Sequence, residues 1–365
     1  MKINFPELKM GNVIAKLPIV QGGMGVGISL SGLASAVANE GGIGVLSAVG
    51  LGALRGKISK ESEIEALREE IRKAKGLTNG LVGLNIMVAL TNFEDLVSAA
   101  LEEKIDVLFF GAGLPLKMPS IMDTEFMQTT KTKFAVIVSS ARAINVIFKT
   151  WARKFSAIPD AVVVEGPKAG GHLGFSIEQI FDKEYELENL VPQVKEAIIP
   201  WSKEFNKEIP LIAAGGIYTG GDIHNIMKLG ANAVQMGTRF VATHECDASA
   251  EFKQSYLDAK KEDIIIINSP VGLPGRALRN SFLDLVKSGK KMPFSCPWKC
   301  LKTCDYHKSP YCIASALLNA KLGNLTNGYA FAGANAYLTD KIISVHELIE
   351  TLKQEYQLAV SAEMQ

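Results

Sequence analysis

Short apolar runs recur through the first two thirds of the chain. Each run is rich in Val, Ile, Leu or Phe and lacks the alternating polar positions of a half-exposed strand. Continuous apolar runs of this length are typical of parallel strands that are buried on both faces. We therefore predict eight parallel β-strands, at residues 17–23, 42–48, 82–88, 106–113, 134–140, 161–166, 210–216 and 233–238.

The segments between these runs carry apolar residues at helical spacing or good helix formers. Strands that alternate with helices over about 240 residues match a (β/α)8 TIM barrel, which is the α/β fold that we predict. An open doubly wound sheet is the alternative, but it usually has fewer than eight strands. The predicted helices lie at residues 29–40, 61–75, 94–103, 141–153, 176–199 and 221–229.

The pattern changes after the eighth run. Residues 241–325 have weaker strand signals, an irregular stretch at 268–280 and an Ala- and Leu-rich helix at 313–323. We predict a barrel domain at 1–240 and a small, mostly helical domain at 241–325 that covers the barrel mouth. The last segment, 326–365, is expected to return to the barrel and to end in an amphipathic helix.

The composition restricts the kinds of molecule that the protein is expected to bind. The 365 residues include 39 Lys plus Arg and 38 Asp plus Glu, so no net field attracts nucleic acid or an anionic membrane. The N-terminus has no apolar core of signal-peptide length, and no apolar run reaches the ~20 residues of a membrane span. We expect a cytoplasmic protein that acts on a small molecule, with a homodimer as the one assembly considered.

Glycines gather where the predicted strands end, which is the catalytic face of a barrel. The loops after the last two strands, 213–222 and 235–240, are glycine-rich and suit phosphate binding through backbone N–H groups. The alternative is that the glycines of these loops only form tight turns between a strand and a helix. Residues 21–25, with Met24, offer bare backbone to a flat ring, and Asn85 offers an amide at the ring edge. A phosphate and a ring together describe FMN, although core packing explains Met24 and Asn85 equally well.

His172 lies in a glycine-rich loop after the sixth predicted strand. Gly170 and Gly171 allow the loop to bend this side chain over the barrel mouth, where their own missing side chains leave room for cofactor and substrate. Histidine transfers protons near neutral pH, so we predict that His172 is catalytic. A structural or solvent-facing histidine is the alternative. Glu165 is predicted to bind the ribityl chain, or else to make a structural hydrogen bond.

Four of the five cysteines crowd into 17 residues, as Cys296, Cys300, Cys304 and Cys312. This density suggests a metal or iron–sulfur site, but the spacing matches neither zinc knuckles nor the common ferredoxin run. The first three also share one helical face, where free thiols pack as small hydrophobes. We assign no metal ligand and leave both interpretations open.

These motifs together resemble the nitronate monooxygenase family, formerly 2-nitropropane dioxygenases, whose close relatives are FMN-dependent enoyl-acyl-carrier-protein reductases. The resemblance rests on PIVQGGMG, GLNIM, DAVVVEGPKAGGHLG, IPLIAAGGI, GANAVQMGTRFVAT and SPVGLPGRA, in that order. Two features depart from the family pattern: Lys168 stands where relatives often carry an acidic residue, and the four-cysteine segment is not general.

The resemblance implies a TIM barrel with non-covalent FMN and with His172 as the active-site histidine. It places Gly22, Gly23 and Met24 along the isoalloxazine, and Asn85 and Glu165 against the cofactor. The phosphate end would be surrounded by Gly215, Gly216, Gln235, Gly237 and Thr238.

Three functions follow from this resemblance and from the cysteines. In the first, an alkyl nitronate gives an electron to FMN and reacts with O2, which yields a carbonyl compound and nitrite. In the second, NAD(P)H reduces FMN, which then reduces the double bond of an enoyl thioester. The third is a non-enzymatic flavin-binding or iron–sulfur sensor, for which the cysteines are the argument.

Overall fold

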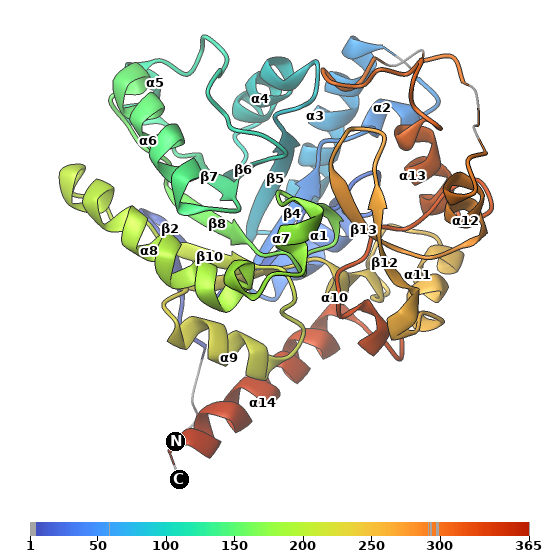
Figure 1. The fold of residues 1–365 in the computed structure, drawn as a ribbon. Coiled ribbons are helices and arrows are strands. Elements are labelled where there is room, and N and C mark those ends of the chain that lie inside the picture. The colour runs from blue at the N-terminus through green and yellow to red at the C-terminus, as the bar shows by residue number, and fades with distance from the viewer. Residues whose placement is uncertain (1–4, 58, 291, 293, 297–298, 365) are drawn as a thin grey trace.

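Eight parallel strands close into a barrel in the order β10-β11-β3-β4-β5-β6-β7-β8 (Figure 1). The computed structural model describes residues 5–57, 59–290, 292, 294–296 and 299–364. The fold is therefore the predicted TIM barrel, and all eight predicted strands are confirmed. Their bounds are β3 Ile19–Gln21, β4 Ile43–Ser47, β5 Leu81–Met87, β6 Val107–Gly111, β7 Lys133–Val138, β8 Ala161–Glu165, β10 Leu211–Ala214 and β11 Ala233–Met236.

Helices surround the barrel on its outer face (Figure 1). The longer helices bury apolar side chains, as α6 does with Ile144, Phe148 and Trp151. Within the described ranges, no helix is long and apolar enough to span a bilayer. The main helices are α1 Ser31–Asn39, α3 Lys60–Leu77, α4 Phe93–Glu102, α6 Ala141–Phe155, α8 Leu187–Glu204 and α9 Gly220–Lys228, with short helices α2 Leu51–Leu54, α5 Thr124–Thr129 and α10 Thr238–Val241.

The single helix predicted at 176–199 is wrong. The chain instead forms α7 (Ile177–Ile180), a 3-10 turn η1 (Lys183–Tyr185) and then α8. The side chain of Asp182 accepts a hydrogen bond from the N–H of Glu184, which starts the separate turn. The helical spacing of apolar residues continues through this region and therefore predicted one helix. The capping hydrogen bond of Asp182 ends the helical backbone there.

A short antiparallel hairpin closes the end of the barrel opposite the strand C-termini. Its strands are β1 (Leu8–Met10) and β2 (Val13–Ala15). Leu8 and Met10 are fully buried in one cluster with the inward-facing side chains of the barrel strands. This hairpin was not predicted, since three-residue strands carry little periodicity.

The segment after β11 contains both helices and strands. Its β12 pairs antiparallel with β13, and β13 pairs with the two-residue strand β9 in the loop after β8. A three-stranded sheet therefore joins this segment to the barrel mouth. The division of the chain into three parts stays a prediction. The elements are β9 Gly171–His172, α11 Ala250–Leu257, η2 Lys261–Asp263, β12 Ile264–Asn268, β13 Pro274–Leu278, α12 Ser281–Lys287, α13 Ile313–Lys321, η3 Ala336–Leu338 and α14 Val345–Glu363, the last being the predicted closing helix.

The close approach of α1 to β4 at Gly44 can be tested by substitution. A Cβ atom at this position in β4 would lie 1.7 Å from the carbonyl oxygen of Ala34 in α1. We expect Gly44→Ala to lower the free energy of unfolding by about 1–3 kcal/mol or more, because helix and strand must separate. Urea unfolding followed by circular dichroism measures this change.

Gly76→Ala in α3 is the matched control, because a Cβ atom there meets nothing within 4 Å. This substitution should stabilise the protein by up to about 1 kcal/mol through higher helix propensity. Equal unfolding midpoints for Gly44→Ala and the wild type would contradict the packing described here.

Candidate active site

A cavity of about 650 Å³ opens at the C-terminal ends of the barrel strands. Its size is within the usual range of small-molecule and cofactor sites, about 300–1,000 Å³. Every residue that the sequence predicted for the site lies on its wall, and their individual roles stay predictions. These residues are Gly22, Gly23, Met24, Asn85, Glu165, Gly170, Gly171, His172, Gly215, Gly216, Gln235, Gly237 and Thr238.

The loop after β3 presents bare backbone to the cavity. A Cβ atom at Gly23 would lie 2.7 Å from both the Asn85 Cβ and the Leu46 carbonyl oxygen, so glycine is required there by packing. The Asn85 amide donates from Nδ2 to the Gly23 carbonyl oxygen at 3.1 Å. Its Oδ1 is buried and has no hydrogen-bond partner among the described residues. Because an unpaired buried acceptor costs free energy, this atom is suited to a ligand N–H.

The loops after β10 and β11 lie on the cavity wall as predicted for a phosphate site. Gly215 and Gly216 have φ angles of +96° and +88°, which other residues rarely adopt. Other polar groups of these loops are engaged within the protein. The Thr238 hydroxyl accepts the Gly333 N–H at 2.9 Å, and the Asn335 amide donates to the Gly216 carbonyl oxygen at 2.6 Å.

The loop that carries His172 is held by the second segment of the chain. His172 pairs with Gly275 in the β9–β13 ladder. Gly171 has a φ of +81°, which explains its need for glycine. A Cβ atom at Gly170 would lie 2.6 Å from the backbone of Ala332 and Gly333. The missing side chain at Gly170 therefore admits another backbone segment, in addition to any room that it leaves for a ligand.

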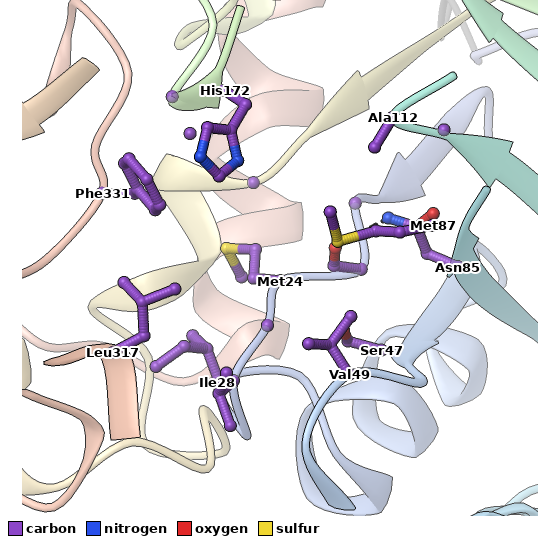
Figure 2. A pocket seen from close by; sticks show the side chains of 18 of the residues that line it. Met24, Ile28, Ser47, Val49, Asn85, Met87, Ala112, His172, Leu317 and Phe331 are labelled. Atoms are coloured by element: carbon purple, nitrogen blue, oxygen red, sulfur yellow. Dashed lines mark hydrogen bonds between the residues drawn. The ribbon is translucent and has the colours of Figure 1, made fainter. Parts of the chain in front are cut away.

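Figure 2 shows the His172 ring and Phe331 on one side of the cavity, opposite Asn85 and Met87, with Met24 between them. His172 Nε2 lies 2.7 Å from Ser269 Oγ. The His172 and Phe331 rings meet edge to face, with centroids 5.0 Å apart. One ring nitrogen is thus fixed by a hydroxyl, while an aromatic ring limits the tilt of the imidazole.

Burial shifts the pKa of two of the titratable groups on the cavity wall, His172 and Glu165. It lowers the pKa of His172 to about 4 and raises the pKa of Glu165 to about 7. The imidazole is consequently neutral at neutral pH and can accept a proton, whereas the Glu165 carboxyl is partly protonated. Lys168 lies at the cavity wall with its Nζ 3.7 Å from Glu186, and both side chains are exposed.

The sequence does not mark Ser269 or Phe331 as part of the site, although Ser269 begins the motif SPVGLPGRA and Phe331 lies in the segment 326–365. Ser269 is 97 positions from His172 in the chain, and it is buried by the turn between β12 and β13. Phe331 belongs to the segment predicted to return to the site, and it does line the cavity. No local pattern marks either side chain as a neighbour of the histidine, because their placement depends on the β9–β13 pairing.

Comparison with known proteins decides the family. The model of the nitronate monooxygenase family matches residues 7–105 and 90–355. The chain belongs to this family. The resemblance drawn from the sequence motifs is confirmed, and the chain is a member of a family of flavin-dependent oxidoreductases.

The names of its relatives state more than one activity. The chain is 26% identical over 307 residues to a probable nitronate monooxygenase of Staphylococcus haemolyticus, and the match covers 74% of this chain and 77% of the relative. It is 28% identical over 275 residues to a (3aS,4S,5R,7aS)-5-hydroxy-7a-methyl-1-oxo-octahydro-1H-indene-4-carboxyl-CoA dehydrogenase of Mycobacterium tuberculosis. That match covers 75% of this chain and 66% of the dehydrogenase.

The solved structures that resemble this chain also differ in the activities that their names state. FabK from Thermotoga maritima has a TM-score of 0.73 and 29% identity, and the match covers 96% of both chains. A nitroalkane oxidase from Streptomyces ansochromogenes has a TM-score of 0.72 and 25% identity, with 95% of this chain and 98% of the oxidase covered. The family is therefore shown, while its members differ in the reactions that their names state.

The protonation of His172 in this family member can be measured directly. We expect its imidazole to titrate with a midpoint near pH 4 and to be neutral at pH 6, because burial disfavours the charged form. An ordinary histidine titrates at about 6.5. Nuclear magnetic resonance of the labelled imidazole follows this titration, and the His172→Ala variant assigns the signal. A midpoint near 6.5 would show that the ring is open to water.

Proposed function

We propose that this protein is an FMN-dependent nitronate monooxygenase, which converts alkyl nitronates and O2 to carbonyl compounds and nitrite. The observation that carries the proposal is the half-buried His172 on the wall of a glycine-lined cavity, with its Nε2 2.7 Å from Ser269 Oγ. Such a group can take the α-proton of a neutral nitroalkane. The similarity to a probable nitronate monooxygenase and to a nitroalkane oxidase supports the same reaction class.

The cavity fits FMN. The unpaired Oδ1 of Asn85 can accept a hydrogen bond from a ring N–H, and the bare backbone at Gly23 leaves a face for the ring. When bound, FMN supplies the redox chemistry. We assign the ring to Gly22, Gly23, Met24, Asn85, Gly170 and Gly171, the ribityl chain to Glu165, and the phosphate to Gly215, Gly216, Gln235, Gly237 and Thr238.

His172 is the residue that we assign to proton transfer. When Nε2–H donates to Ser269 Oγ, the lone pair of Nδ1 remains for the α-proton of the substrate. Ser269 is then a positioning residue that fixes the tautomer. Phe331, Met24 and Met87 make this part of the cavity apolar, which excludes water from the reacting groups.

The alternative is an NAD(P)H-dependent enoyl-acyl-carrier-protein reductase that uses FMN. The similarity to FabK over 96% of both chains is the observation that favours it, and the named CoA dehydrogenase relative also acts on a thioester. In this reaction, His172 would lie near the thioester carbonyl as a polarising group or proton donor.

Replacement of the histidine tests its role. We expect His172→Ala to retain FMN and to lower kcat/KM for a neutral nitroalkane by about 10² to 10⁴-fold, the usual contribution of a general base. The loss should be smaller with a preformed nitronate, which has already lost its proton. Steady-state oxygen consumption measures both substrates.

His346→Ala is the matched control, because that histidine is exposed on α14 and interacts with Glu40. It should leave both rates unchanged. Full turnover of the nitroalkane by His172→Ala with flavin still bound would exclude this histidine as the base.

Anaerobic reduction distinguishes the two activities. The proposed monooxygenase should lose the absorption of oxidised flavin when a nitronate is added and keep it when NADH or NADPH is added. Rapid bleaching by NADH or NADPH, without bleaching by the nitronate, would reject the monooxygenase in favour of the reductase. A stopped-flow absorption measurement under nitrogen records both reactions.

A further inference from the structure

Lys168 is a charged side chain of the cavity wall to which the proposed reaction assigns no role. It lines the wall together with Gly215 and Gly216, in the loop to which we assign the FMN phosphate. A Cβ atom at Gly216 would lie 2.9 Å from the Lys168 Cβ, 3.1 Å from its Cδ and 3.5 Å from its Cγ. The lysine stem therefore runs across the glycine of this loop.

The backbone of Lys168 is held in this place by two neighbouring segments. The loops after β8 and β10 pack on each other, because these strands are neighbours in the barrel. A Cβ atom at Gly215 would lie 2.8 Å from the Gly166 carbonyl oxygen and 3.1 Å from the Ala169 nitrogen. The Ala334 N–H donates to the Lys168 carbonyl oxygen at 3.0 Å. The position of the lysine beside the loop is therefore fixed by the fold.

The start of helix α9, where backbone N–H groups would ordinarily suit an anion, is already bonded to carboxylates of the protein. Asp222 Oδ2 accepts the N–H groups of Tyr218 at 3.0 Å and Thr219 at 2.9 Å. Glu355 of α14 accepts the Gly220 N–H at 2.7 Å. Because like charges repel, a phosphate in the preceding loop needs a cation beside it.

The topology of the barrel decides which cation can lie there. Among the described residues of the cavity wall, the Lys and Arg side chains are Lys57, Lys60 and Lys168. Lys57 and Lys60 follow β4, which β3 and β11 separate from β10, whereas Lys168 follows β8, which pairs with β10. Arg239 is not part of the wall, and its Cζ lies 4.5 Å from the centroid of the Tyr218 ring. Lys168 is therefore the cation of the wall that lies against the loop after β10.

The present partner of the Lys168 ammonium holds it only weakly. Lys168 Nζ lies 3.7 Å from Glu186 Oε1, and the two side chains are 44% and 40% exposed. Exposed ion pairs of this kind contribute little to stability, because water screens them. The flexible four-carbon stem of lysine lets the ammonium turn to another anion. Lys168 can therefore exchange the Glu186 carboxylate for a phosphate at little cost.

We propose that the Lys168 ammonium binds the phosphate of FMN and thereby selects FMN over riboflavin, which has no phosphate. The glycine backbone of the loop supplies N–H donors, and Lys168 supplies the positive charge, as lysine does in other phosphate sites. This inference rests on the proposed binding of FMN. It holds for both reactions considered above, because both use the same cofactor.

The test is flavin binding by the full-length protein after its flavin has been removed, measured by quenching of flavin fluorescence. We expect Lys168→Gln to raise the Kd for FMN by about tenfold, as the loss of one hydrogen bond to a charged group does. The Kd for riboflavin should keep its wild-type value. Added salt should weaken FMN binding more in the wild type than in the variant, because salt screens the attraction between ammonium and phosphate.

Lys183→Gln is the matched control, because it removes the same charge from an exposed side chain of η1 that is not part of the cavity wall. It should leave both Kd values unchanged, and Lys168→Arg should retain most of the affinity for FMN. Wild-type affinity of Lys168→Gln for FMN would overturn the proposal, and so would an equal loss of affinity for FMN and riboflavin. A wild-type protein that binds neither flavin would reject the FMN proposal itself, so the two failures are distinguished.

Discussion

The pairing of β9 with β13 is the interaction on which the site depends. It joins Gly171 and His172 in a barrel loop to Gly275 and Arg276, about 100 residues later in the chain. Arg276 is buried and its guanidinium donates hydrogen bonds to the carbonyl oxygens of Pro167 and Ala169, which fixes the start of the same loop. Without this ladder, Ser269 would not reach the imidazole, and one wall of the cavity would be lost.

The same burial that holds His172 in place also selects its chemistry. A desolvated imidazole with a pKa of about 4 is unprotonated at neutral pH, so its lone pair is free, and it is a weaker base than an exposed histidine. Glu165, whose pKa burial raises to about 7, holds negative charge only in part. The cavity therefore combines a neutral imidazole with the ionisable side chains of Lys57, Lys60, Glu63 and Lys168 on its wall.

The barrel could be predicted because buried parallel strands leave a direct mark on the sequence, namely continuous apolar runs that end in glycine. The cavity residues followed, because the ends of such strands meet at one face. The sequence did not reveal the break between α7 and α8, where the Asp182 cap overrides helical spacing. It also did not reveal that Ser269 meets His172, since that contact arises from pairing between distant two- and five-residue strands.

A crystal structure of the protein grown with FMN tests the central claim most directly. The account predicts one flavin in the cavity, with its ring against Gly23, a ring N–H bonded to Asn85 Oδ1, and the His172 imidazole facing the ring. Flavin bound elsewhere, or an Asn85 Oδ1 that remains without a partner while His172 points away from the ring, would contradict it.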